Sequence, residues 1–252
     1  PEILFFWVAR MIIAGYEYRG EMPFKNVYLT GIVRDKQGRK MSKSLGNSPD
    51  LLALIDKYGA DAVRFGILIS SPAGNDLLWD ESSNEQGLHF NNKLWNALKL
   101  VKGFKERAKD DDTIAKPSFA IDWMQNRLAQ VRATLEIEFK EFRLSEALKT
   151  IYSLIWDDFC SVYLEGVKPK YGEKISEPAR IQTQEFFSDL MKAIHPFMPF
   201  ISEELWTTLT AGESLVIADW PLANSSHIDK NSEKIIVSIQ EVITEVRRFR
   251  ND

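Results

Sequence analysis

A change of pattern near residue 82 restricts the fold of this sequence more than any other feature. Before it, apolar residues form short runs separated by glycine, proline and charged residues. After it, they recur at the three- and four-residue spacing of amphipathic helices. Short connections between such helices favour an antiparallel bundle. We predict its helices over residues 84–109, 120–139, 144–167, 177–195 and 201–209.

The residues outside this region predict smaller elements. Pro1 suits the first position of a helix that we expect over 3–18, with Gly15 and Gly20 breaking the run. An apolar, β-branched run over 26–33 predicts a buried strand. The remaining predictions are a helix over 51–58 that is capped by Ser48-Pro49-Asp50 and ended by Gly59, a helix over 61–68, a short strand over 215–218 and a last helix over 235–249.

The strands before residue 75 are too few to close a sheet. They are expected to form the last part of a nucleotide-binding α/β fold, in which ligands sit at the carboxyl ends of the strands. We therefore predict a mostly α-helical chain. Its parts are a C-terminal remnant of a Rossmann-like α/β domain over 1–78, an antiparallel helical bundle over 79–222 and the start of a C-terminal extension over 223–252.

Composition excludes several classes of protein. The single cysteine, Cys160, rules out an internal disulfide and a cysteine metal cluster, and it fits a reducing, cytoplasmic compartment. The apolar stretch over 3–14 is too short to span a bilayer. No histidine has the companions of a metal site or a catalytic triad. We expect a monomer with no membrane contact and no bound metal. A net charge of −4 leaves nucleic-acid binding to local basic patches.

The segment Lys40-Met41-Ser42-Lys43-Ser44 has the pattern of a phosphate-handling loop. Lys40 and Lys43 are three residues apart, so a compact turn can direct both ammonium groups at one anion. The two serines add hydroxyl donors, and Gly46 lets the backbone approach a ligand closely. Residues 35–38 form a turn that presents the loop. Such a loop can neutralise charge that develops on a nucleotide triphosphate.

A polar face on the first long helix is the second candidate site. Lys93, Asn96 and Lys99 are three residues apart and lie away from the apolar stripe, with Asn91 and Asn92 beside them. Such a face can hydrogen-bond exposed bases and neutralise phosphate, as in recognition of RNA loops.

Six motifs in a fixed order resemble a known family. The KMSKS pentapeptide over 40–44 is similar to the second signature of class I aminoacyl-tRNA synthetases. The order of all six resembles the valyl-tRNA synthetase family, and ILFFWVARM over 3–11 separates that family from the isoleucyl enzymes. The other motifs are GADAVRF over 59–65, NKLWNA over 92–97, WDDFC over 156–160 and HPFMPFISEELW over 195–206.

The resemblance implies a two-step reaction and a role for each matched residue. Valine and ATP, with Mg²⁺, would give valyl-adenylate and pyrophosphate, and the valyl group would then pass to tRNA-Val. Lys40, Lys43 and Ser42 would be catalytic, and Trp7 would wall the valine pocket. The resemblance further implies ATP binding by Gly31 and Lys40 to Ser44 (including Met41), and anticodon binding by Asn92, Lys93, Asn96 and Lys99.

Several family features have no counterpart in this sequence. The HIGH signature is absent, and so are the editing domain and the C-terminal coiled-coil arm. We therefore expect the end of a catalytic domain plus an anticodon-binding bundle, inactive by itself. Two alternatives stay open: a stand-alone RNA-binding module without catalysis, and a stretch of an isoleucyl-type synthetase.

Overall fold

The computed structural model describes residues 3–71, 74–104, 118–169, 174–210 and 212–221, together with isolated positions between 235 and 249. The described part is mostly helical and contains a two-stranded sheet, so the predicted fold class is confirmed. Most of the extension predicted over 223–252, including most positions of the helix predicted over 235–249, lies outside the described residues. None of the helices in the described ranges has the length and apolar character needed to cross a membrane.

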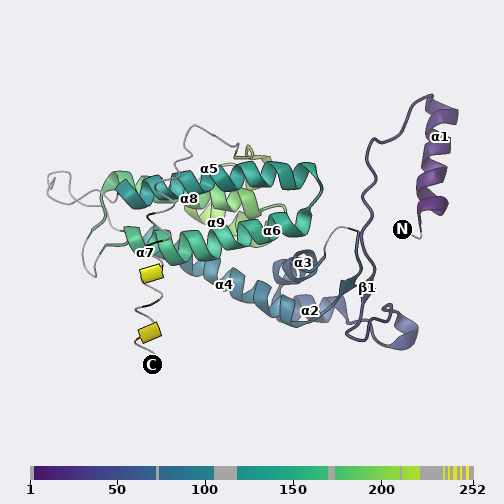
Figure 1. Cartoon of the computed structure of the whole chain (residues 1–252), viewed down its shortest axis with the longest axis horizontal. Helices are drawn as coiled ribbons and strands as arrows, with labels where there is room; N and C mark the ends of the chain where they lie inside the picture. Colours follow the sequence, from purple (N-terminus) through teal and green to yellow (C-terminus); the bar gives the residue numbers. More distant parts are fainter. Residues whose placement is uncertain are drawn as a thin grey trace.

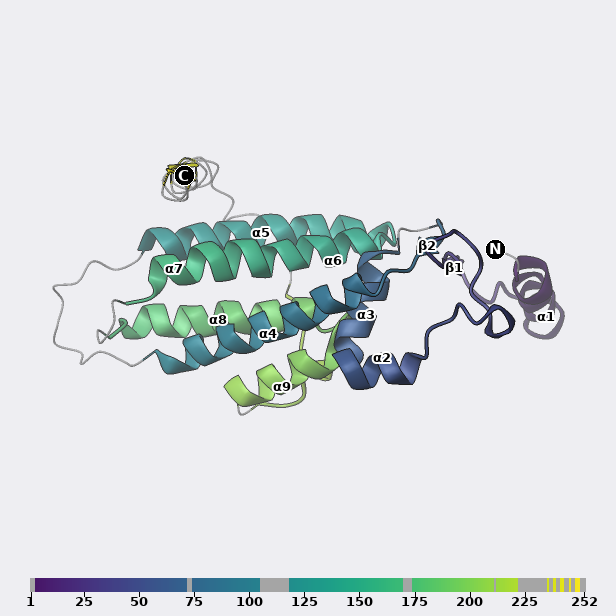
Figure 2. The same cartoon turned by 90° about the horizontal axis from the view of Figure 1, so that it is seen from below.

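The bundle forms the larger part of the molecule (Figures 1 and 2). Its large side chains share one core, which includes Phe90, Leu94, Met124, Leu148, Phe159 and Phe187. Every helix predicted for this region is present. They are α4 (Ser82–Gly103), α5 (Ser118–Lys140), α6 (Leu144–Ser153), the π-helix η3 (Leu154–Tyr163), α7 (Leu164–Val167), α8 (Glu177–Ile194) and α9 (Pro199–Leu209).

Two details of the bundle differ from the predictions. The helix predicted over 84–109 ends at Gly103, because Phe104 has an extended backbone. The helix predicted over 144–167 is continuous but widens to π geometry in η3, where the Ser161 hydroxyl donates to the carbonyl of Trp156 at 2.7 Å.

The amino-terminal helix stands apart from the bundle (Figure 1). It begins as a π-turn, η1 (Leu4–Val8), and continues as α1 (Ala9–Arg19). Gly20 ends it, as predicted, and has a left-handed conformation with φ of 71°. Gly15 does not break the helix; it lies inside α1, packed against Pro23. No residue of η1 or α1 is buried, so this element has no core of its own.

The strand predicted over 26–33 is wrong for most of its length. Only β1 (Val33–Arg34) is a strand, and it pairs in parallel with β2 (Leu77–Leu78). A strand requires a neighbour to satisfy its backbone groups, and β2 is the only strand beside β1 among the described residues. The residues before β1 therefore run as an irregular segment.

Two short helices join β1 to the bundle. They are α2 (Leu51–Tyr58) and α3 (Ala60–Ile69), and both pack on α4. Asp50 caps α2 by accepting from the Leu52 and Ala53 amides at 2.9 and 3.4 Å, as predicted. Phe65 of α3 belongs to the bundle core, so packing is continuous across the predicted domain limit at residue 78.

The strand predicted over 215–218 is also wrong. This segment is the 3₁₀-helix η4 (Leu215–Ile217). Its first amide groups are capped by side chains: the carboxylate of Glu203 on α9 accepts from the Leu215 amide at 2.9 Å, and the Ser214 hydroxyl accepts from the Val216 amide at 3.4 Å. Side-chain caps of this kind favour a tight turn over an unpaired strand.

Candidate phosphate-binding loop and RNA-binding face

The predicted phosphate loop begins where β1 ends. The Gly38 amide donates to the carbonyl of Asp35 at 2.9 Å, which closes the predicted turn. Gly38 has a φ of 78°, a conformation that favours glycine. The Met41 amide then donates to the carbonyl of Val33 at 3.2 Å. This short hairpin places residues 40–44 beside the carboxyl end of β1.

A buried carboxylate organises the hairpin. Oδ1 of Asp35 accepts from the amides of Gln37 and Arg39 at 3.0 and 2.9 Å. Its Oδ2 accepts from Nε of Arg39 at 2.8 Å and from Nδ2 of Asn47 at 3.0 Å. The hydrogen bond from Asn47, followed by those from Arg39, lowers the pKa of Asp35 to about 2 despite burial. The carboxylate is therefore charged at neutral pH.

The tip of the loop is a single 3₁₀ turn, η2 (Lys43–Leu45). The Ser42 hydroxyl caps it by accepting from the Leu45 amide at 3.2 Å, and the hydroxyl oxygens of Ser42 and Ser44 lie 3.1 Å apart. Gly46 ends the turn in a left-handed conformation with φ of 63°. Its own backbone and the two serines thus order the tip.

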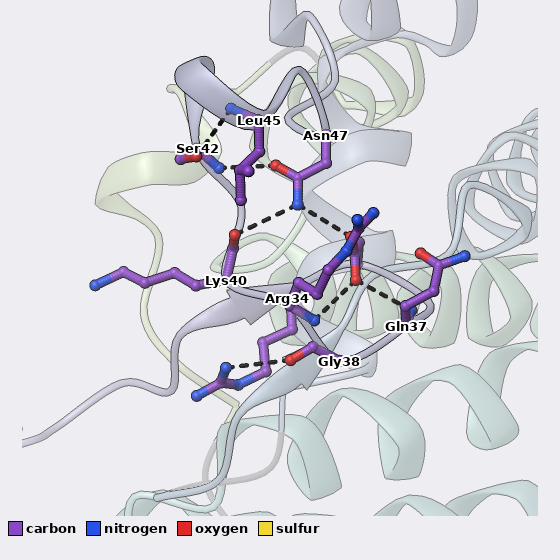
Figure 3. A network of polar contacts seen from close by, with 9 residues as sticks. Arg34, Gln37, Gly38, Lys40, Ser42, Leu45 and Asn47 are labelled. Atoms are coloured by element: carbon purple, nitrogen blue, oxygen red, sulfur yellow. Dashed lines mark hydrogen bonds and ion pairs between the residues drawn. The ribbon is translucent and has the colours of Figure 1, made fainter.

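The two loop lysines are exposed to solvent. Figure 3 shows the side chain of Lys40 pointing away from the polar network, while its carbonyl takes part in it. Lys43 is exposed on η2. A loop with a fixed backbone and exposed ammonium groups can attract a polyanion such as a triphosphate.

Gly31 has a packing role that the sequence did not reveal. A Cβ atom at this position would lie 1.7 Å from the carbonyl oxygen of Asn75. The two segments approach so closely because the Asp76 carboxylate accepts from the Ile32 amide at 3.0 Å and pairs with Arg34. An apolar cavity of about 290 Å³ opens beside Gly31, toward Leu144 of α6.

Trp7 does not lie near this loop in the described structure. It is on η1, 58% exposed, and the helix that follows stands apart from β1 (Figure 1). The aromatic side chain therefore has no pocket around it within the described residues.

The predicted polar face of α4 divides into two parts. Asn92, Asn96 and Lys99 are exposed. Lys93 is half-buried, and its Nζ lies 5.1 Å from the ring centroid of Trp156 on η3, a cation–π arrangement. Trp156 in turn stacks on Tyr152, with ring centroids 5.6 Å apart.

The sequence alone does not assign Trp156 to this face. The only feature in the sequence that singles out Trp156 is its place in the WDDFC motif. Its contact with Lys93 depends on how α4 and η3 pack together.

Two family models match this chain, one over the part that contains the phosphate loop and one over the later part of the bundle, and the face of α4 lies between the two matched ranges. The family model described as "tRNA synthetases class I (I, L, M and V)" matches residues 1–80, which contain the KMSKS loop. The model described as "Anticodon-binding domain of tRNA ligase" matches residues 122–252. The chain belongs to the class I tRNA synthetases. The predicted class is thereby confirmed, and the valine–tRNA ligases described next, which are about half identical to this chain, confirm the predicted family.

Individual synthetases show how much of the family's length the chain represents. It is 53% identical over 252 residues to valine–tRNA ligase of Phocaeicola vulgatus and 52% identical over 257 residues to that of Christiangramia forsetii. These alignments cover 98% and 100% of the chain but 28% and 29% of the two relatives. The chain thus spans less than a third of these synthetases.

A solved synthetase structure shares the fold. Leucyl-tRNA synthetase of Agrobacterium radiobacter K84, in a ternary complex with tRNA and LeuAMS, superposes with a TM-score of 0.65 at 22% identity. The superposition covers 87% of this chain and 27% of that one. At this identity the likeness establishes the arrangement of elements alone.

Proposed function

We propose that the chain provides the ATP-phosphate loop and the anticodon-binding bundle of a valine–tRNA ligase. The observation that carries the proposal is the KMSKS loop, ordered at the end of β1 with Lys40 and Lys43 exposed, in a chain half identical to such ligases. The complete enzyme would activate valine with ATP, release pyrophosphate and transfer the valyl group to tRNA-Val.

Each loop residue has a role that its geometry supports. The ammonium groups of Lys40 and Lys43 would neutralise charge on the ATP phosphates as pyrophosphate leaves, and the Ser42 hydroxyl would add a donor. Met41 and Ser44 would contact ATP from the same turn. Gly31 would keep the neighbouring backbone close, through its contact with Asn75.

ATP would bring Mg²⁺ with it, but this loop does not fit the ion. The one buried carboxylate here, on Asp35, already accepts four hydrogen bonds from Gln37, Arg39 and Asn47. Elsewhere in the described residues, no group of three or more His, Cys, Asp or Glu side chains could hold a metal. We assign no Mg²⁺ ligand among the described residues.

The remaining assignments concern partners and organisation. Trp7 would line the valine pocket, and Asn92, Lys93, Asn96 and Lys99 would face the tRNA anticodon. We propose a monomeric, cytoplasmic enzyme with domain limits at residues 78 and 222. The 252-residue chain alone would not activate valine, because it has no HIGH signature and its described part has only a two-stranded sheet.

A chimera tests the proposed function. Residues 1–252 replace the matching stretch of the Phocaeicola vulgatus ligase, and valine-dependent ATP–pyrophosphate exchange and valylation of tRNA-Val are measured. We expect both activities to be retained. Lys43→Ala should lower kcat by about 10²-fold, as for loss of one group that stabilises transition-state charge.

Lys36→Ala is the matched control. Lys36 lies in the same hairpin, is exposed and pairs with Asp80 at 3.2 Å, an exposed ion pair of little energetic value. A folded chimera that activates isoleucine in preference to valine, or that keeps full activity with Lys43→Ala, would contradict the proposal.

A further inference from the structure

Asn47 connects the base of the phosphate loop to its tip. Its Nδ2 donates to the Asp35 carboxylate at 3.0 Å and to the Lys40 carbonyl at 3.3 Å. Its Oδ1 accepts from the Ser42 amide at 2.9 Å (Figure 3). One side chain thus bonds the residue before the loop and the backbone at two positions inside it.

These hydrogen bonds fix the backbone conformation at both lysines. Lys40 is held by its carbonyl, and Lys43 follows Ser42, whose amide is held and whose hydroxyl caps η2. We propose that Asn47 is a positioning residue that sets the relative placement of the two ammonium groups for phosphate binding. This rests on the proposed function of the loop, and it gives the loop a structural support outside the KMSKS residues themselves.

The charge at Asp35 explains why a neutral amide stands at position 47. Arg39 provides the positive partner of Asp35, with Nη2 at 2.7 Å from Oδ2. The neighbouring cations face other carboxylates, Arg34 pairing with Asp76 and Lys36 with Asp80. An amide donates to Asp35 and accepts from the loop at once, whereas an ionised carboxylate accepts only.

Replacement of Asn47 therefore has a specific signature. Asn47→Ala removes all three hydrogen bonds, so the pKa of Asp35 should rise from about 2 toward its ordinary value of 3.8, since that bond is the largest cause of its depression. The protection of the Ser42 amide against hydrogen exchange should fall about tenfold, as expected for one lost hydrogen bond.

In Asn47→Asp, the order of the loop should depend on pH with the opposite sign to that in the wild type. In the wild type, the depressed pKa means that Asp35 supports the loop above pH 3.8 and loses this effect as pH falls through about 2. In Asn47→Asp, two carboxylates repel each other at neutral pH and the pair takes up one proton at a raised pKa. The protonated pair can donate and accept as Asn47 does, so protection of the Ser42 amide should increase as pH falls.

The experiment uses the isotopically labelled 252-residue chain, with carbon NMR titration of the Asp35 carboxyl and amide exchange at Ser42. Gln37→Ala is the matched control: it removes an exposed amide side chain from the same hairpin but keeps the Gln37 backbone bond to Asp35. An Asn47→Ala variant with wild-type titration and wild-type protection, or an Asn47→Asp variant without acid recovery, would overturn the proposal.

Titration with inorganic triphosphate separates this proposal from the proposed function. Asn47→Ala should weaken binding at Lys40 and Lys43 about tenfold relative to the wild type and to Gln37→Ala. If the wild type binds no triphosphate while Asn47→Ala still loosens the loop, the phosphate-binding function fails for this chain and Asn47 remains the residue that orders the loop. If wild type and Asn47→Ala bind triphosphate equally, the positioning role is overturned and the function stands.

Discussion

At the scale of single residues, contacts between distant positions determine the geometry around the phosphate loop. Gly31 touches the backbone of Asn75, and Asp35 is hydrogen-bonded by Asn47. The sequence identifies the loop lysines by their spacing, but it carries no local pattern for these pairs. Each pair forms because the chain after β1 folds back toward the residues at the two ends of that strand.

Gly31→Ala should destabilise the fold strongly. The added Cβ would meet the Asn75 carbonyl oxygen at 1.7 Å, so β1 and β2 must separate, which costs about 1–3 kcal/mol by analogy with overpacked cores. Urea unfolding followed by circular dichroism measures the change.

Gly103→Ala is the control, because apart from its own helix and chain neighbours no described atom lies within 4 Å of its added Cβ. Equal midpoints for the two variants would contradict the packing role of Gly31.

Cys160 should react slowly with alkylating reagents in the folded chain. Burial raises the pKa of its thiol to about 11, against the opposing effect of the Lys93 ammonium. Because the thiolate is the reactive form, alkylation by iodoacetamide at pH 8 should be about 10²-fold slower than in urea-unfolded chain. The rate should rise with each pH unit up to about 11, and a rate that levels off near pH 8.5 would show the thiol to be unperturbed.

At the scale of elements, α3 connects the part that bears the loop to the corner between α8 and α9. The Asp61 carboxylate accepts from the Phe200 and Ile201 amides at 3.4 and 2.6 Å, at the start of α9. Arg64 donates from Nε to the carbonyl of Phe197 at 3.0 Å, just after α8 ends. Each charge therefore complements the helix end that it faces. Burial raises the pKa of Asp61, and the two amide donors oppose that rise.

His195 supports the same corner. Its Nδ1 lies 2.8 Å from the Ser202 hydroxyl, which donates to the Met198 carbonyl at 2.7 Å. Burial lowers the pKa of this imidazole, which favours its neutral form. These contacts give His195 a structural role at the start of α9.

Asp61→Ala should lower the free energy of unfolding by about 1–2 kcal/mol, the usual cost of a lost helix cap. The side chain of Met198, the N-cap residue, does not cap α9. Asp61 therefore supplies the hydrogen bonds that the start of this helix lacks. Thermal and urea unfolding measure the effect.

The comparison variant is Asp56→Ala, on the exposed face of α2, which should change stability by about 0.5 kcal/mol or less. If both variants unfold alike, Asp61 is not a cap.

At the scale of the whole molecule, the sequence predicts elements better than it predicts their contacts. Helical periodicity identified α4 and its buried stripe, since Leu94, Leu98 and Val101 are 0%, 2% and 1% exposed. Local caps also predicted α2 correctly. The strand over 26–33 failed because a strand depends on its neighbours, and the contact of Lys93 with Trp156 depends on the packing of α4 against η3. The sequence therefore proposes the candidate sites, while the residues that support them are visible only in the structure.

We propose that the bundle recognises an anticodon through the exposed face of α4. The most direct test is binding of the chain to tRNA-Val and to the same tRNA with a swapped anticodon, at two salt concentrations. We predict a preference of about tenfold or more for the native anticodon, reduced by Asn96→Ala and Lys99→Ala. Lys149→Ala, on the exposed surface of α6, removes the same charge as Lys99→Ala and should keep the preference. Equal binding of the two tRNAs that disappears at the higher salt concentration would show phosphate attraction alone and would contradict the claim.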